Sequence, residues 1–95
     1  MNHVIKNFKN HAIIPAYTPY FDAGTAIEII SECKKEQVQI YGIDAVKISE
    51  YGTQPFMEHS VDYSYVSNVW DEALTFIHSK QNLGLHFEIV MSDDE

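Results

Sequence analysis

The side chains that could carry chemistry in this sequence are mainly carboxylates at alternating positions. Glu58 and Asp62 lie in an alternating segment over residues 56–65, and Glu88 follows His86 by two positions. Alternate residues of a β-strand point to the same face, so each pair is expected on one face of a strand. Two carboxylates held in this way can act as general acid and base, as in glycosidases, but nothing in the sequence indicates a sugar-binding cleft.

Common catalytic motifs are absent from the sequence. It has no Gly-rich phosphate loop, no G-x-S-x-G turn and no H-E-x-x-H pair. A metal site needs at least three converging ligands, whereas His86 and Glu88 provide two, and His59 is expected in the core. We therefore expect neither catalysis nor a bound metal or cofactor. The alternative is a small enzyme, or a metal- or metabolite-binding domain, that uses Asp62, His86 and Glu88.

The charge of the chain favours a cationic partner over nucleic acid. Lysine and arginine together number six against fourteen acids, for a net charge of −8, and all six are lysines. Lys6 and Lys9 both precede the first acid, Asp22, so the rest of the chain is more acidic still. Arginine is the side chain best suited to phosphate and guanine, so direct binding of nucleic acid is not expected. A high net charge also keeps small proteins soluble, which is the plainer explanation.

The single cysteine and the hydropathy of the chain indicate a reducing compartment away from membranes. Cys33 lies on the apolar side of an expected helix, where it should pack as a small hydrophobic residue. No apolar run approaches the roughly 18 residues that a membrane span needs. The N-terminal segment lacks the pattern of a secretory signal. We expect a cytoplasmic protein without membrane contact.

Two amphipathic helices are predicted. The first follows an N-cap at Asp22 and covers residues 23–36, with a capping box three residues later as the alternative start. The second is opened by Ser67 or Asn68 and ends near Gln81.

Three strands are predicted between and after these helices. The first covers residues 38–48 and is disturbed near Gly42, which indicates a bulge or a close backbone approach. A turn over residues 49–55 leads into the second arm of a hairpin, residues 56–65, and the last strand covers residues 85–91. The second arm should direct these side chains to the core: Met57, His59, Val61, Tyr63 and Tyr65.

These elements predict a single two-layer α+β domain over residues 1–95. Both helices are expected on one face of a mainly antiparallel sheet of three to four strands. The first 21 residues are expected to form an edge strand or a lining segment, and residues 92–95 a frayed acidic tail. The other face of the sheet would then gather polar side chains, namely Glu58, Ser60, Asp62, Ser64, His86 and Glu88.

Residues 26–45 carry a family resemblance. They begin A-I-E, contain two adjacent lysines and include G-I-D, which are here Ala26, Ile27, Glu28, Lys34, Lys35, Gly42, Ile43 and Asp44. In these motifs, in the tyrosine-rich segment VDYSY and in the order of elements, residues 23–91 resemble the immunity proteins against anticodon-cleaving colicins of the E-five type. Related immunity proteins accompany the toxins of contact-dependent growth inhibition and other polymorphic toxin systems.

The resemblance implies a bacterial antitoxin. Such a protein binds the basic C-terminal nuclease domain of its cognate toxin, here a tRNA-cleaving ribonuclease, and blocks access of RNA. We expect a monomer that forms a 1:1 heterodimer with this domain. The chain departs from the family pattern at Ala45, Val46 and Lys47 and in an added turn at Tyr51 and Gly52, which leaves the identity of the toxin open.

Six residues are predicted to bind the toxin. The anionic contacts are Asp44, Glu58, Asp62 and Glu88, and the packing anchors are Tyr51 and Tyr65. Asp44 belongs to the matching G-I-D motif, whereas the others follow from face and charge. Carboxylates fixed on a sheet can occupy a phosphate-binding cleft in place of RNA. A structural adaptor that pairs through an exposed strand edge is the remaining alternative.

Overall fold

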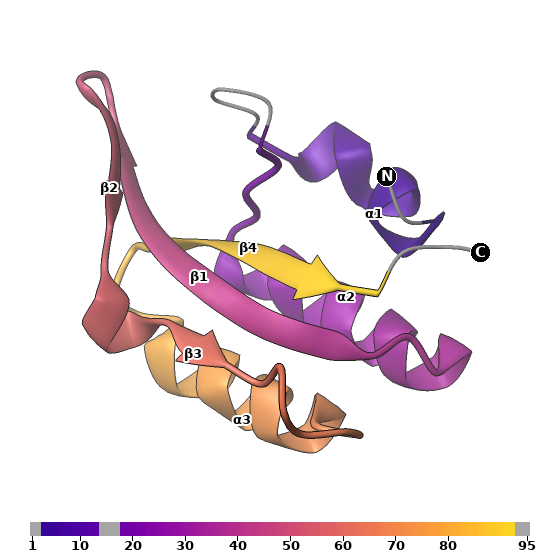
Figure 1. The fold of residues 1–95 in the computed structure, drawn as a ribbon. Helices are drawn as coiled ribbons and strands as arrows, with labels where there is room; N and C mark the ends of the chain where they lie inside the picture. Colours follow the sequence, from indigo (N-terminus) through magenta and orange to yellow (C-terminus); the bar gives the residue numbers. More distant parts are fainter. Residues whose placement is uncertain (1–2, 14–17, 93–95) are drawn as a thin grey trace.

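The computed structural model describes residues 3–13 and 18–92 as an α+β fold with helices packed against an antiparallel sheet (Figure 1). The helical elements are α1 (His3–Phe8), η1 (Lys9–His11), α2 (Ala23–Glu36), η3 (Met57–His59) and α3 (Trp70–Lys80). The strands are β1 (Ile40–Ser49), β2 (Gly52–Pro55), β3 (Val61–Asp62) and β4 (His86–Met91). None of the helices in this part of the chain is long and apolar enough to cross a lipid bilayer.

Strand β1 is the centre of the sheet, because the three other strands all pair with it in antiparallel fashion. One edge of β1 pairs with β4 and the other with β2 and then β3. The ladder between β1 and β4 is irregular between Ile40 and Gly42, where Tyr41 is the extra residue of a bulge. The predicted disturbance near Gly42 is therefore confirmed as a bulge.

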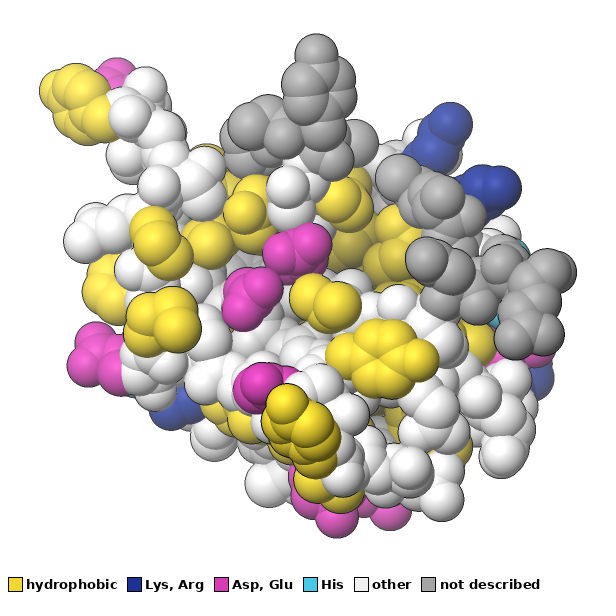
Figure 2. Space-filling model, viewed as in Figure 1, with side chains coloured by type: hydrophobic (Ala, Val, Ile, Leu, Met, Phe, Trp, Pro, Cys, Tyr) yellow, Lys and Arg dark blue, Asp and Glu magenta, His cyan; other side chains and the backbone are white. Residues whose placement is uncertain are grey.

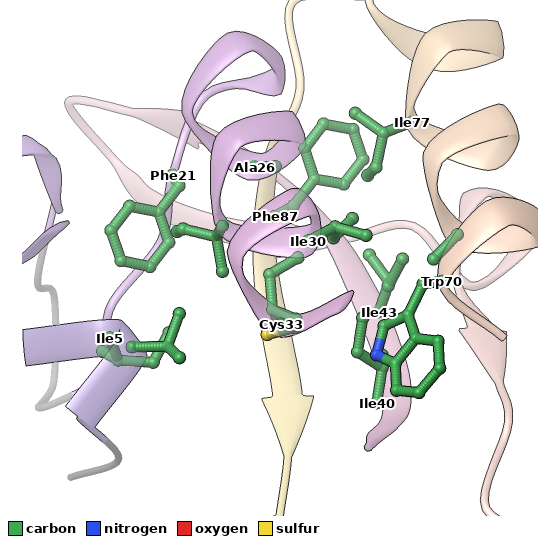
Figure 3. Packing of buried hydrophobic residues seen from close by; sticks show 14 of the residues in the cluster. Ile5, Phe21, Ala26, Ile30, Cys33, Ile40, Ile43, Trp70, Ile77 and Phe87 are labelled. Atoms are coloured by element: carbon green, nitrogen blue, oxygen red, sulfur yellow. The ribbon is translucent and has the colours of Figure 1, made fainter. Parts of the chain in front are cut away.

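The core lies between the sheet and the helices, so the predicted two-layer arrangement is confirmed, with three α-helices in the described chain instead of two. Figure 3 shows Phe87 of β4 among residues of α2, with Ile43 of β1 facing Trp70 of α3. Helix α1 adds Val4 and Ile5 to the same cluster. Each fully buried side chain of this kind contributes roughly 1.5–3 kcal/mol of transfer free energy.

Helix α2 begins where the sequence predicts. The Asp22 carboxylate accepts a hydrogen bond of 2.8 Å from the backbone N–H of Thr25, and this bond lowers the pKa of Asp22. Gln37 ends the helix in the left-handed conformation at φ 61°, with its N–H donated to carbonyls of the last turn. The start at Asp22 is therefore confirmed over the alternative capping box.

Helix α3 ends near Gln81 as predicted, with Gln81 as its C-cap, but its predicted N-cap is wrong. The N-cap is Val69, which makes no side-chain hydrogen bond. Asn68 instead exchanges two hydrogen bonds with the side chain of Gln39 and adopts φ 58°. The side-chain amide of Asn68, which was predicted to cap α3, therefore makes a tertiary contact with Gln39 instead. The indole Nε1 of Trp70 donates to the Val38 carbonyl at 2.8 Å, which fixes the first turn of α3 against the entry to β1.

Cys33 is a core residue, as predicted. It is fully buried, and its sulfur lies 3.8 Å from the sulfur of Met91. Burial raises the pKa of the Cys33 thiol to about 12, so the thiol stays protonated and unreactive at neutral pH.

The prediction of one continuous strand over residues 56–65 is wrong. The chain turns through η3 after Phe56 and returns to β1 for only two residues. The Ser60 hydroxyl explains the excursion, because it accepts from the Ala45 N–H at 2.9 Å and donates to the Phe56 carbonyl at 2.8 Å. The Ser60 hydroxyl thereby replaces a backbone carbonyl as the acceptor for the Ala45 N–H of β1. Of the residues expected in the core, Val61 and Tyr63 pack against it, His59 is half-buried, and Met57 and Tyr65 are exposed.

The prediction for the first 21 residues is partly wrong. Residues 3–8 form α1, a helix that sequence reasoning missed. Pairing at the sheet edge does occur later, since Phe21 and Phe87 exchange backbone hydrogen bonds and Ile13 bridges Tyr20. Residues 14–17, with Pro15 among them, and residues 93–95 of the expected tail lie outside the described residues.

Removing the cap of α2 tests this account of the fold. Asp22→Ala should lower the free energy of unfolding by about 1 kcal/mol, because it leaves the Thr25 N–H without its acceptor. Asp22→Asn should retain most of the stability, since asparagine caps helices as well. Urea denaturation at pH 7 measures both, and Glu28→Gln is the matched control. A larger loss for Glu28→Gln than for Asp22→Ala would instead support the capping box.

Candidate functional site on the outer face of the sheet

The face of the sheet that points away from the helices carries a row of acidic residues. Along β1, Ile43 and Ala45 are buried in the core, so Asp44 between them points outward. Along β4 the same alternation turns Glu88 outward, and Asp44 and Glu88 are direct partners in the ladder. We call this side the outer face; it carries Gly42, Asp44, Asp62, His86, Glu88 and Val90.

A groove of about 520 Å³ lies on the outer face. It is bounded by β1, η3, β3 and the end of β4, and its lining residues are Tyr41, Gly42, Asp44, Met57, Ser60, Val61, Asp62, Ser64 and Val90. Figure 2 looks onto this face and shows acidic and hydrophobic side chains next to one another at its centre, with lysines only at the margins of the view. The described lining therefore combines apolar surface with carboxylates and includes no cation.

Gly42 forms the floor of the groove because it has no side chain. It is paired with Asp62, and a Cβ atom on Gly42 would lie 3.1 Å from the backbone oxygen of Val61. A contact that short is tighter than normal packing allows, so a larger residue would push β3 away from β1. The glycine of the G-I-D motif thus permits β3 to approach, and it leaves the outer face hollow beside Asp44.

Asp62 is held in one orientation by the turn that follows β3. Its carboxylate accepts a 2.8 Å hydrogen bond from the N–H of Ser64, and the Tyr63 N–H bonds the Tyr41 carbonyl at 2.8 Å. Hydrogen bonds from the Ser64 side chain and backbone lower the pKa of Asp62. Asp62 is therefore a fixed, ionised carboxylate at the rim of the groove.

Asp44 and Glu88 form a pair of like charges across the ladder between β1 and β4. Burial raises the pKa of Glu88, and the neighbouring carboxyl of Asp44 raises it further. The phenol of Tyr20 is near the same pair, since burial first and then Glu88 and Asp44 raise the pKa of Tyr20. Like charges placed directly opposite each other destabilise a sheet, so this pair lowers the stability of the fold.

The structure brings together three of the six predicted site residues. Asp44 and Asp62 line the groove, and Glu88 is adjacent to Asp44. Glu58 lies on η3 with its side chain 72% exposed, outside the lining. Tyr51 is 92% exposed at the tip of the hairpin between β1 and β2, which Figure 1 shows projecting from the body, and Tyr65 is 97% exposed beyond β3.

Sequence reasoning missed the apolar part of this site. Tyr41, Met57 and Val90 are exposed hydrophobic residues that line the groove. The pattern placed Met57 in the core, because a continuous strand was assumed where η3 lies. The bulge turns Tyr41 outward, and only the disturbed alternation at Gly42 could have signalled it.

The groove combines carboxylates with exposed apolar side chains. Within residues 3–13 and 18–92, no three His, Cys, Asp or Glu side chains are grouped so that they could hold a metal ion. His86 faces Val46 in the ladder and does not line the groove. Fixed carboxylates beside exposed apolar side chains can bind a cationic group that has an apolar stem.

No protein-family model matches this chain, and no curated protein is significantly similar to it.

The raised pKa of Glu88 makes stability depend on pH. A carboxyl whose folded pKa exceeds its unfolded pKa is penalised when ionised, so its cost appears as pH rises from the ordinary glutamate range through the folded pKa. Glu88→Gln should therefore be more stable than the wild type at pH 7, by roughly 0.2–1 kcal/mol as for other cross-strand charge pairs. The gain should vanish below about pH 4, where wild-type Glu88 is protonated in both states.

Urea denaturation of both proteins at pH 7 and pH 4 measures this difference. Glu58→Gln, on the exposed η3, is the matched control and should show no such gain at pH 7. A Glu88→Gln variant that is destabilised equally at both pH values would refute the charge-pair account.

Proposed function

We propose that this protein is an immunity protein that binds the cationic nuclease domain of a bacterial toxin and neutralises it. The toxin is a ribonuclease that cleaves tRNA, and the immunity protein covers the cleft that holds the RNA. The binding surface is the outer face, centred on the groove. No catalysis by this protein is involved.

The observation that carries the proposal is the acidic outer face. Asp44, Asp62 and Glu88 are held on one surface by strand pairing and by the turn at Ser64. A rigid anionic surface of this kind matches a phosphate-binding cleft, because such a cleft is lined with cations. Complementary potentials would also speed the encounter of the two proteins.

The exposed apolar residues supply what charge alone does not. Specific complexes depend on a few desolvated anchors, with aromatic and methionine side chains enriched among them. Met57 is 80% exposed and Tyr41 is 43% exposed, and both line the groove next to the carboxylates. This mixture is typical of an interface centre surrounded by a charged rim.

A small-molecule site is the second candidate, and the volume of the groove favours it. About 520 Å³ falls within the range of ligand pockets. The described lining offers two carboxylates and no cation, so the ligand would have to be a cationic metabolite. Native mass spectrometry of the purified protein decides this point, because a retained small molecule would favour the second candidate.

The partner itself is the first test. The neighbouring reading frame should encode a protein that ends in a small basic nuclease domain. That domain should co-purify 1:1 with this protein and cleave tRNA only when this protein is absent. A neighbouring domain that remains fully active with a molar excess of this protein would refute the proposal.

Charge reversal on the outer face tests the surface. Asp44→Lys with Asp62→Lys should slow association with the nuclease domain roughly tenfold at low salt and flatten its salt dependence, because attraction is replaced by repulsion. Stopped-flow fluorescence measures the association rate. The matched control is Glu28→Lys with Glu72→Lys, which changes net charge equally on the helical layer. Equal slowing by both pairs would indicate steering by net charge and exclude a special role for this face.

A further inference from the structure

We propose that the groove is a receptor for one arginine side chain of the partner protein. Its aliphatic stem would lie on Met57 and Val90, and its guanidinium would lie between Asp44 and Asp62, beside the ring of Tyr41. The inference rests on the proposed function in one respect, that the partner is a cationic protein. It adds which residue type the groove selects and where on the outer face that residue binds.

The spacing of the two carboxylates supports a bridging cation. Asp62 lies opposite Gly42, and Asp44 is two residues further along β1 on the same face. Residues in diagonal positions on neighbouring strands are about 7–8 Å apart, so two carboxylates there can approach one group from two sides. Gly42, which pairs with Asp62 and is two residues from Asp44, has no side chain and lines the groove.

The walls of the groove suit the stem of a long side chain. Met57, Val61 and Val90 present apolar surface, and Val90 is 38% exposed. Long cationic side chains bury their methylene groups on such surface while the charged end stays at polar partners. The Ser60 hydroxyl accepts from the Ala45 N–H and donates to the Phe56 carbonyl, so its position in the lining is fixed.

Tyr41 favours arginine over lysine. The bulge turns this ring outward, and it lines the same groove as the two aspartates. A guanidinium is planar and weakly hydrated, stacks on aromatic rings and binds carboxylates in a forked geometry, whereas an ammonium is a compact and strongly hydrated charge. A groove with one aromatic wall and two carboxylates therefore matches arginine in shape and charge.

No positively charged side chain is among the described residues that line the groove. The chain has no arginine of its own, and Lys47, the lysine of β1, is paired opposite Gln54 of the hairpin. The described lining residues include no Lys or His, so no internal cation neutralises Asp44 and Asp62 there. Glu88 stands next to Asp44 and adds to the negative potential at this end of the groove.

Three capped tripeptides test the proposal without the partner. Acetyl-Gly-Arg-Gly-amide is titrated into isotopically labelled protein at constant ionic strength, with the lysine and the neutral citrulline peptides as comparisons. The amide resonances of Gly42, Asp62 and Val90 should move with a saturable dependence in the millimolar range for arginine. The lysine peptide should bind at least about threefold more weakly, and the citrulline peptide should leave these resonances unchanged.

Variants then locate the cation. Asp44→Asn with Asp62→Asn should abolish the shifts, and the folded state should persist because asparagine supports the same turn at Ser64. Tyr41→Leu should reduce the preference for arginine over lysine, and Glu28→Gln on α2 should change nothing. Shifts that survive in the double variant, or equal binding of the citrulline peptide, would overturn the proposal.

The results separate this inference from the proposed function. If the nuclease domain is inhibited and the arginine peptide does not bind the groove, the arginine receptor is refuted and the immunity function stands. If the peptide binds as expected and no cationic domain is inhibited, the groove is an arginine site and the immunity function fails.

Discussion

Among the described residues, strand β1 pairs with β2, β3 and β4, so its alternation decides which side chains enter the core and which face outward. Its inward residues, Ile43 and Ala45, are buried in the same core cluster as residues of α2 and α3. That burial fixes Asp44 on the opposite side, because a shift of one residue would expose the core set and bury the carboxylate. Burial of the apolar side chains on one face of the sheet thus fixes the charged side chains on the other face.

The outer face is organised at some cost to stability. Asp44 and Glu88 are placed opposite each other although like charges repel, and burial raises the pKa of Glu88. Proteins commonly keep such unfavourable arrangements where function needs them, since selection maintains stability only above a threshold. In the proposed complex, a cation bound beside Asp44 would weaken this repulsion.

Much of the architecture follows from local patterns. Asp22 and the apolar stripe after it place α2 correctly, and the alternation around Phe87 places β4. The predicted α+β layers are confirmed because amphipathic helices and a one-sided sheet can bury their apolar faces only against each other. Alternation predicted Asp62 and Glu88 on the polar face of the sheet. Asp44 lies where the alternation of residues 38–48 is disturbed, so only the resemblance at G-I-D pointed to it.

The sequence by itself determined which residues are acidic, which helices are amphipathic and which face of β4 is buried, because these properties depend on neighbours along the chain. Tertiary structure alone decided the groove. Ser60 reaches across to Ala45 and breaks the expected strand, which exposes Met57, while the bulge exposes Tyr41 and Gly42 admits β3. Each of these contacts joins residues distant in sequence, and local periodicity carries no information about such pairs.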